Sequence, residues 1–278
     1  MRRRIRMMSI GCMILGLNLL LYPAFSNWYT EIRQGEVIRT YQEGVEQMKE
    51  EELLCARQRA RAYNERLGWL TRQETNTAMQ NLDYEELLNE NGDGVMGYIE
   101  IPSIDVHLPI YHGTTEQSLS KGAGHLMNTS LPIGGRSTHC VVSAHRGDPS
   151  AALFTRLDEL QIGDVFSLYV LEETLVYQVD QIKTVLPYET EDFQIVTGED
   201  YVTLVTCTPY GINTHRLLVR GRRVQGKQEQ QETEKPKAAE KRNTVEDAWI
   251  YAAIATSILI GVAVHCRVKK RKKDTPVS

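Results

Sequence analysis

The sequence predicts a mainly β protein, folded as a closed β-barrel or a β-sandwich, with helices before it and an apolar segment near each end of the chain. From about Gly94 the chain consists of short β-rich segments separated by Gly, Pro, Asn and Asp. Many short strands with few helices are typical of closed barrels and sandwiches. The region before Gly94 instead has apolar residues at helical spacing, and each apolar end segment approaches the ~20 residues of a membrane-spanning helix.

The two apolar segments are predicted to span a membrane. The first covers about Met7 to Phe25 after four arginines, and the second covers about Ala248 to Cys266 before six basic residues. Positive charge beside a span favours the cytoplasmic side, so we expect both chain ends inside and the part between them outside. Ala24-Phe25-Ser26 resembles a cleavage site, so a cleaved signal peptide is the alternative for the first segment. A buried core helix is the alternative for the second, and the cations that follow it argue against this.

The polar stretch after the first span is predicted to be helical. Four apolar residues recur there at helical spacing between charged ones: Ile38, Tyr41, Val45 and Met48. We expect one or two amphipathic helices from Asn27 to Leu67, which form a solvated stalk or pack on the domain that follows. Residues Gly68 to about Asn81 are expected to be a loop.

The β-rich part of the chain contains a series of candidate strands. They are Met96–Ile101, Val106–Tyr111, His139–Ala144, Val165–Val170, Thr174–Val185, Tyr201–Cys207 and Arg216–Val224. Leu175, Tyr177 and Val179 alternate with mostly polar neighbours, as expected of a half-buried strand. A short helix is expected from Ala151 to Leu160, after Pro149. The stretch from Val224 to Asp247 is dominated by Gln, Glu, Lys and Ala and is predicted to be a hydrated spacer.

Charge and cysteine content narrow the class of protein. The net charge of −4 gives no indication of nucleic-acid binding. Of the five cysteines, Cys12 and Cys266 fall in the apolar segments, which leaves Cys55, Cys140 and Cys207 between them. Because this number is odd, at least one external thiol is unpaired or linked to another chain. A secreted domain stapled by disulfides would have a different pattern.

Cys207 is the first candidate catalytic residue. It ends the β-rich run Tyr-Val-Thr-Leu-Val-Thr-Cys, and Pro209 and Gly211 force a turn before the next strand begins at His215 or Arg216. Two strands joined by this loop place the Cys207 sulfur and the Arg216 guanidinium at the same end of the sheet. An arginine beside a thiol favours the thiolate or donates to an oxyanion. A buried structural cysteine is the alternative interpretation.

Nucleophilic cysteine chemistry also needs a proton-transfer partner, and His145 is the candidate. It follows the apolar run Cys-Val-Val-Ser-Ala and precedes a turn with Gly and Pro, so it too is presented at a strand end. The sequence alone does not bring His145 and Cys207 together. The other histidines between the apolar segments compete for this role: His107, His112, His125, His139 and His215.

One stretch matches a metal-binding motif. Residues Asn89 to Glu100 follow the calcium-loop template of an EF-hand, except that Asn replaces Asp at the first position. An EF-hand needs a helix on each side, whereas Glu100 lies in Tyr-Ile-Glu-Ile-Pro, which is typical of a strand. We therefore predict a turn that enters a strand. Nothing else in the chain has metal-ligand spacing, so we expect no metal.

Several motifs in the right order resemble the sortase family. Thr-Leu-Val-Thr-Cys207, with Arg216 nine positions later, is similar to the sortase signature. Four segments are similar to the pilus-assembling class C branch of this family: Ser143-Ala-His145-Arg-Gly, Met96-Gly-Tyr-Ile-Glu-Ile-Pro, Leu131-Pro-Ile-Gly-Gly and the run from Cys207 to Gly221. The resemblance covers about Leu87 to Arg223. It implies a closed barrel of about eight strands, with His145, Cys207 and Arg216 as the catalytic set.

With this resemblance the chain divides into successive parts. These are a signal or anchor segment (1–26), a helical region with a lid loop (27–86), the catalytic barrel (87–223), a polar linker (224–247), a membrane helix (248–266) and a basic cytoplasmic tail (267–278). Class C sortases usually carry an Asp-Pro-aromatic anchor in the lid. Between Glu31 and Gly94 this sequence has no Asp-Pro, and Trp69 is the candidate substitute.

The resemblance implies a transpeptidase that acts on secreted pilin subunits. Cys207 attacks the Thr carbonyl of a Leu-Pro-x-Thr-Gly motif, His145 protonates the departing amine, and Arg216 donates to the oxyanion or fixes the peptide. A lysine of another pilin then resolves the thioester, without nucleotide, metal or other cofactor. Two alternatives stay open: a sortase that anchors surface proteins to cell-wall precursor peptide, and a non-catalytic membrane-tethered adhesin or scaffold.

Overall fold

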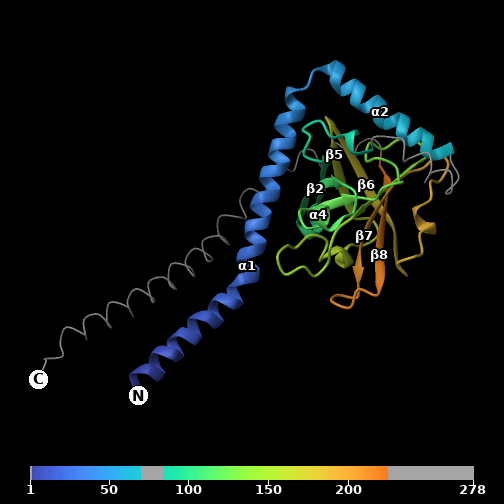
Figure 1. Ribbon diagram of the computed structural model, residues 1–278. Helices are drawn as coiled ribbons and strands as arrows, with labels where there is room; N and C mark the ends of the chain where they lie inside the picture. The colour runs from blue at the N-terminus through green and yellow to red at the C-terminus, as the bar shows by residue number, and fades with distance from the viewer. Residues whose placement is uncertain (1, 70–83, 225–278) are drawn as a thin grey trace, which may run out of the picture. The chain divides into compact units, whose positions relative to one another are not determined.

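The computed structural model describes residues 2–69 and 84–224 (Figure 1). The predicted C-terminal span and basic tail therefore lie outside the described residues. The helices are α1 (Arg2–Gln47), α2 (Glu50–Trp69) and α4 (Glu116–Leu119), with short 3-10 helices at Tyr84–Glu86, Pro102–Ile104, Leu157–Glu159 and Glu191–Phe193. The strands are β1 (Val95–Ile101), β2 (Val106–His112), β3 (Ala123–His125), β4 (Thr138–Ser143), β5 (Val165–Val170), β6 (Glu173–Val185), β7 (Asp200–Thr208) and β8 (His215–Arg223).

These strands form a closed barrel, which confirms the predicted fold class. Its order is β1-β2-β3-β4-β7-β8-β6-β5, so eight strands close on themselves. Most neighbours are antiparallel, but β2 with β3 and β4 with β7 are parallel. Every predicted strand is present, with ends that differ by at most one residue. The strand that was missed, β3, is only three residues long, which is too short for an alternating pattern to be visible.

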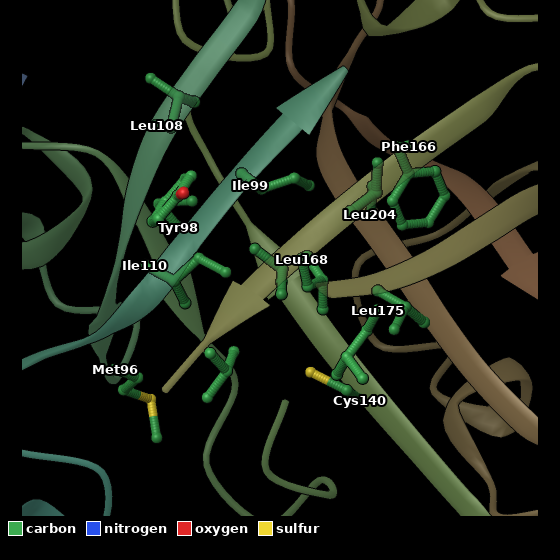
Figure 2. Packing of buried hydrophobic residues seen from close by; sticks show 14 of the residues in the cluster. Met96, Tyr98, Ile99, Leu108, Ile110, Cys140, Phe166, Leu168, Leu175 and Leu204 are labelled. Carbon is green, nitrogen blue, oxygen red and sulfur yellow. The ribbon is translucent and has the colours of Figure 1, made fainter. Parts of the chain in front are cut away.

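Apolar side chains from the strands fill the barrel. Figure 2 shows Ile99 of β1 and Ile110 of β2 in the middle of this cluster, with Met96 of β1 towards one end and Phe166 and Leu204 towards the other. All five are fully buried. The strands therefore have a rigid inner face, and the side chains that alternate with it point outward.

The helical region before the barrel is confirmed as two helices that pack on it. In α1 the predicted periodic residues Ile38, Tyr41 and Val45 are buried in the same cluster as the barrel core. The Tyr41 hydroxyl donates to the Met96 carbonyl at 3.2 Å and accepts from the Leu171 amide at 2.7 Å. These helices are thus part of the folded domain and not a solvated stalk.

The second helix, α2, also bonds directly to the barrel domain. The Asn64 side chain is buried and makes two hydrogen bonds with the Leu131 backbone. α2 continues to Trp69 and so includes the first two residues of the predicted loop, whereas residues 70–83 lie outside the described part. Whether this segment forms a lid therefore stays untested, and the role of Trp69 in it stays a prediction.

The N-terminal part of α1 is apolar. Helix residues Ser9–Gln47 include a window with mean hydropathy 1.6, none of which is buried, and this is long enough to cross a membrane. Both a membrane anchor and a signal sequence have this property. The described residues from Ser26 onward belong to one compact unit, and the part of α1 up to Phe25 belongs to another.

The predicted helix from Ala151 to Leu160 is wrong. This segment consists of turns with only a 3-10 turn at Leu157–Glu159. The Phe154 amide donates to the His145 carbonyl at 3.1 Å, and Thr30 of α1 donates to the Ser150 carbonyl at 3.0 Å. A helix would join the Ser150 carbonyl to the Phe154 amide, so tertiary partners have taken the groups that the helix needs. Leu153 also has φ of 41°, outside the helical region.

Candidate active site

The three predicted catalytic residues lie at one end of three neighbouring strands. Cys207 of β7 is directly opposite Arg216 of β8 in the antiparallel ladder. On the other side of β7, the parallel strand β4 places Ser143 opposite Val205. β4 ends at Ser143, and we infer from this register that His145, two residues further along, lies beside Cys207. We therefore expect His145, Cys207 and Arg216 to form a row at the ends of the neighbouring strands β4, β7 and β8.

Strand alternation puts Cys207 and Arg216 on the outer face of the barrel. Val205, two residues before Cys207, and Leu218, two residues after Arg216, belong to a small apolar cluster separate from the main core. The alternating residues Leu204 and Leu217 lie in the main core instead. Cys207 and Arg216 are both partly exposed, as a reagent or a substrate would require.

The two cysteines of the barrel differ sharply in environment. Cys140 is 3% exposed and packs in the core, where Figure 2 shows its sulfur among apolar side chains. Burial raises the pKa of the Cys140 thiol far above its ordinary value. Cys207 is a partly exposed free thiol at the strand end. The thiol that is able to react is therefore Cys207.

His145 is fixed by its backbone more than by its side chain. Its carbonyl accepts from the Phe154 amide at 3.1 Å, and the preceding amide of Ala144 donates to the Val205 carbonyl at 3.1 Å. The Nε2 atom lies 3.4 Å from Glu116 Oε2 of α4. That contact lacks hydrogen-bond geometry, and within the described residues this buried Nε2 has no hydrogen-bond partner. The Glu116 side chain is 86% exposed, so water screens its charge.

Arg216 and Arg220 share a strand but have different partners. Arg216 Nη1 donates to the carbonyls of Asn213 and His215, at 3.2 Å and 3.0 Å. Arg220 forms a bidentate pair with Asp180 at 2.9 Å and lies over the Tyr201 ring. No acidic side chain within 4.0 Å of Arg216 is found in the part of the chain that the structure describes. Arg216 therefore keeps its charge available for an anion.

The competing histidines have other partners. His125 is fully buried, with Nδ1 2.7 Å from the Tyr84 hydroxyl, and burial lowers its pKa to about 4. His139 contacts the Gln194 carbonyl and the Thr203 hydroxyl, and burial lowers its pKa too. His112 contacts two backbone carbonyls, and His107 lies against the Tyr98 ring. His215 is close to the site, opposite Thr208 in the ladder, but it alternates with Arg216 and so belongs to the other face.

The calcium-loop match is a turn, as predicted. The Asn89 side chain accepts from the Gly94 amide at 2.9 Å, and the Asp93 carboxylate accepts from the Val95 amide at 3.0 Å. Glu100 lies in β1 and accepts from the Tyr169 hydroxyl at 2.8 Å. Across residues 2–69 and 84–224, no group of three or more His, Cys, Asp or Glu side chains is arranged to hold a metal.

Two residues near the site were not predicted from the sequence. Glu116 reaches His145 from α4, a helix of four residues that begins after the N-cap Thr115. A capping residue followed by so short a segment gives little signal in a sequence. Arg146, the residue after His145, has its guanidinium on the Thr208 hydroxyl at 3.2 Å. Its position beside His145 was the available signal.

Comparisons with known proteins agree on one family. The sequence model of the sortase domain matches residues 99–224. Sortase C1 of Streptococcus agalactiae is 49% identical, with a TM-score of 0.63 over 69% of this chain and 100% of that one. Sortase C of Streptococcus pneumoniae is 47% identical, with a TM-score of 0.60 over 69% and 97%. Sortase C of Clostridium perfringens, solved with the C-terminal cell wall sorting motif, is 44% identical, with a TM-score of 0.59 over 69% and 99%.

Curated relatives at lower identity point to the same family. Sortase A of Bacillus anthracis is 29% identical over 143 residues, which is 50% of this chain and 65% of that protein. Sortase D of Bacillus subtilis is 30% identical over 131 residues, 46% of this chain and 63% of that protein. The matched stretch thus covers slightly less than two thirds of each.

Proposed function

The chain belongs to the sortase family of cysteine transpeptidases, and we propose that it joins secreted pilin subunits into a pilus. The proposed substrate is a Leu-Pro-x-Thr-Gly-like sorting motif at the pilin C-terminus, cleaved between Thr and Gly. The acceptor is a lysine amine of another pilin. The observation that carries the proposal is the pairing of Cys207 with Arg216 in the β7–β8 ladder, with His145 two residues beyond the end of β4, the other neighbour of β7. The similarity to class C sortases, one described in terms of pilin substrate specificity, supports the pilin as substrate.

The first half of the reaction forms an acyl-enzyme. The Cys207 thiolate attacks the carbonyl carbon of the Thr, and the carbonyl π electrons move onto oxygen to give a tetrahedral oxyanion. Arg216 donates to this oxyanion or to the adjacent peptide backbone. As the intermediate collapses, the C–N bond to Gly breaks and the His145 imidazolium protonates the departing amine. A thioester on Cys207 and a peptide with a free Gly amine result.

The second half transfers the acyl group. The lysine amine of the next pilin attacks the thioester carbonyl, neutral His145 accepts its proton, and the thiolate leaves. One amide bond is exchanged for another, so the reaction needs no nucleotide or other energy source. The enzyme returns to thiolate and imidazolium, the pair from which it started.

The surface around the thiol suits an extended peptide with an apolar residue. Val205 and Leu218 share the face of Cys207 and Arg216. Three partly buried side chains pack against them: Val185 at the end of β6, and Leu126 and Phe193 from outside the strands. A leucine on the N-terminal side of the scissile Thr would add to this cluster and remove apolar surface from water. The charge of Arg216 would meet the polar backbone of the same peptide.

The membrane arrangement is part of the proposal. The apolar window in α1 supports retention at the membrane, and the basic residues before it and after residues 248–266 favour a cytoplasmic location for both chain ends. The barrel would then lie outside the cell, where pilins are exported. The proposed reaction does not involve nucleic acid.

Anchoring of surface proteins to cell-wall precursor peptide is the second candidate function. The chemistry is identical and only the amine differs, so the catalytic row fits both. The similarity to class C structures favours pilins. A non-catalytic adhesin or scaffold is the remaining alternative, and it would tolerate the loss of Cys207.

Mass spectrometry of the acyl-enzyme tests the proposal. The full chain in detergent is incubated with a Leu-Pro-x-Thr-Gly peptide, and we expect an adduct on Cys207 with the mass of the peptide up to Thr. A lysine-bearing pilin fragment and a wall precursor peptide are then offered in parallel, and the pilin is expected to discharge the thioester faster. Absence of an adduct in the unaltered chain would contradict the transpeptidase proposal. Faster discharge by the wall peptide would favour the second candidate.

A further inference from the structure

Arg146 is almost buried next to the catalytic row and connects three segments. Its side chain is 8% exposed. Nε donates to the Thr155 carbonyl at 3.2 Å, Nη1 donates to Thr208 Oγ1 at 3.2 Å, and Nη2 pairs with the Asp158 carboxylate. Arg146 directly follows His145, and Thr208 directly follows Cys207. One hydrogen bond therefore joins the residues just beyond the imidazole and the thiol.

A second polar bond joins the residues just before them. The buried Thr206 hydroxyl donates to the Ala144 carbonyl at 2.8 Å. His145 and Cys207 thus lie between two cross-strand bonds, one from Thr206 to Ala144 and one from Arg146 to Thr208. The regular pairing of β4 with β7 reaches only to Ser143 and Val205. Beyond this last pair, hydrogen bonds from the side chains of Thr206 and Arg146 connect the two segments.

We propose that Arg146 and Thr208 form a bridge that sets the separation of the Cys207 thiol from the His145 imidazole. This inference rests on the proposed function. Arg146 acts as a positioning residue, because its charge is already paired with Asp158 and its donors are directed to protein acceptors. The guanidinium is a rigid planar fork, so three fixed acceptors hold it in one orientation. Arg216, in contrast, supplies charge to the substrate.

The bridge matters because proton transfer depends steeply on distance. A general acid has to lie within hydrogen-bond reach of the group that it protonates. A displacement of about 1 Å costs on the order of 10²-fold in rate when it misaligns reacting groups. His145 lies two residues beyond the end of β4, so without the bridge the bonds of Ala144 to β7 and of the His145 carbonyl to the Phe154 amide would have to hold it. Loss of the bridge should therefore lower kcat and leave peptide binding largely unchanged.

Thr208 offers a clean pair of substitutions. Thr208→Val keeps the branched shape and removes the hydroxyl, whereas Thr208→Ser keeps the hydroxyl. With the full chain and a sorting peptide, we expect Thr208→Val to lower kcat by about tenfold with KM within about twofold, and Thr208→Ser to retain activity. Arg146→Lys should resemble Thr208→Val, and the double variant should be no worse than the poorer single one, since both remove the same bond. Arg156→Gln, which removes a nearby surface arginine paired with Glu159, is the matched control.

A second measurement separates failure of the bridge from failure of the proposed function. Iodoacetamide alkylation of Cys207, followed by mass spectrometry of its peptide, needs no substrate. We expect slower alkylation in Thr208→Val than in Thr208→Ser, with unchanged thermal unfolding, because the imidazole no longer assists the thiol. Equal alkylation and equal kcat in Val and Ser variants, or additive effects of Arg146→Lys and Thr208→Val, would overturn the bridge. If the unaltered chain joins no peptide, the alkylation comparison alone decides.

Discussion

Cys207 lies directly opposite Arg216 in the β7–β8 ladder, while Arg220, four residues further along β8, is opposite Thr203. The antiparallel register therefore gives the thiol one arginine neighbour and directs the other to Asp180. Both guanidiniums are on the outer face of the barrel. Arg216 and Arg220 are the same residue type, and it is their position in the ladder that puts Arg216 next to the thiol and Arg220 next to Asp180.

Replacement of Arg216 should therefore affect catalysis more than replacement of Arg220. Loss of one oxyanion donor commonly costs ~10²–10³ in rate, so we expect Arg216→Ala to lower kcat by about this factor. Arg220→Ala should lose at most about 1 kcal/mol of stability with its partly exposed ion pair. Steady-state kinetics and thermal unfolding of both variants check this. Equal, mild effects on kcat would mean that neither guanidinium meets the transition state.

The cysteines of the barrel should respond differently to substitution. Cys207→Ala should abolish transpeptidation without loss of the fold, because the alanine methyl fits a partly exposed strand end. Cys140→Ala should retain activity and lose about 1 kcal/mol of stability, since it removes a sulfur from the packed core. Peptide joining and circular dichroism measure the two effects. Peptide joining by the Cys207→Ala enzyme would refute the nucleophile assignment.

Buried His125 should make the barrel sensitive to mild acid. Burial lowers its pKa from 6.5 to about 4, so the unfolded chain binds a proton that the folded chain does not between these values. Stability should fall as pH decreases from about 6.5 towards 4, by about 3 kcal/mol from this group. The raised pKa of Asp200 acts in the opposite direction and reduces the net effect. Denaturant unfolding at a series of pH values measures the slope.

His125→Gln is the variant that isolates this contribution. Gln is neutral at every pH and keeps polar groups near the Tyr84 hydroxyl, which contacts His125 at 2.7 Å. We expect a flatter dependence of the unfolding free energy on pH below 6.5 than in the unaltered chain. An unchanged slope would assign the acid sensitivity to other groups, of which buried His139 is the first candidate.

The membrane topology is tested by protease accessibility. The basic flanks of the apolar segments predict an external barrel and a cytoplasmic C-terminus. Protease added to intact protoplasts should digest the barrel and spare a tag placed after Ser278. Loss of the tag together with the barrel would reverse the topology and place the active site in the wrong compartment.

The segment from Gly68 to Asn81 should give Cys207 little protection. The Asp-Pro anchor of class C lids is absent from the sequence between Glu31 and Gly94, and Gly68 and Trp69 do not restrict the backbone as Pro does. Deletion of residues 68–81 should change the iodoacetamide alkylation rate of Cys207 by no more than a few-fold. Exposed Cys55 on α2 serves as the internal reference thiol. An increase of tenfold or more, ~1.4 kcal/mol of protection, would show that this segment acts as a lid.

The β-strands were predictable because their pattern is local. Alternation of apolar and polar residues fixes a strand within its own few residues, so β5, β6 and β7 were found to within one residue. The helical spacing of about 3.6 residues likewise identified Ile38, Tyr41 and Val45 as one face of a helix, and this face is buried. The prediction that the strands close into a barrel of about eight came from the resemblance to the sortase family, because alternation within one strand does not show which strands pair.

The elements that were missed depend on distant partners. The segment from Ala151 to Leu160 has helical composition, but Thr30 and His145 engage its backbone instead. The parallel pairing of β4 with β7 joins residues about 60 positions apart, and it is the register from which we infer that His145 lies beside Cys207. Sequence reasoning supplied the residue types and the strand ends. It did not predict that β4 pairs with β7. It therefore could not predict the contact of Arg146 with Thr208, which depends on this pairing.

The packing of α1 on the barrel has a practical consequence for shortened forms of the protein. Tyr41 bonds to both Met96 and Leu171, so a fragment that starts at residue 87 would leave polar backbone groups without their partner. It would also uncover the apolar surface that Ile38 and Val45 now seal, and such patches promote aggregation. A soluble fragment should therefore begin near Ser26, inside α1, where the compact unit begins. The start of the compact unit thus falls inside α1, which runs from Arg2 to Gln47, and not at an end of that helix.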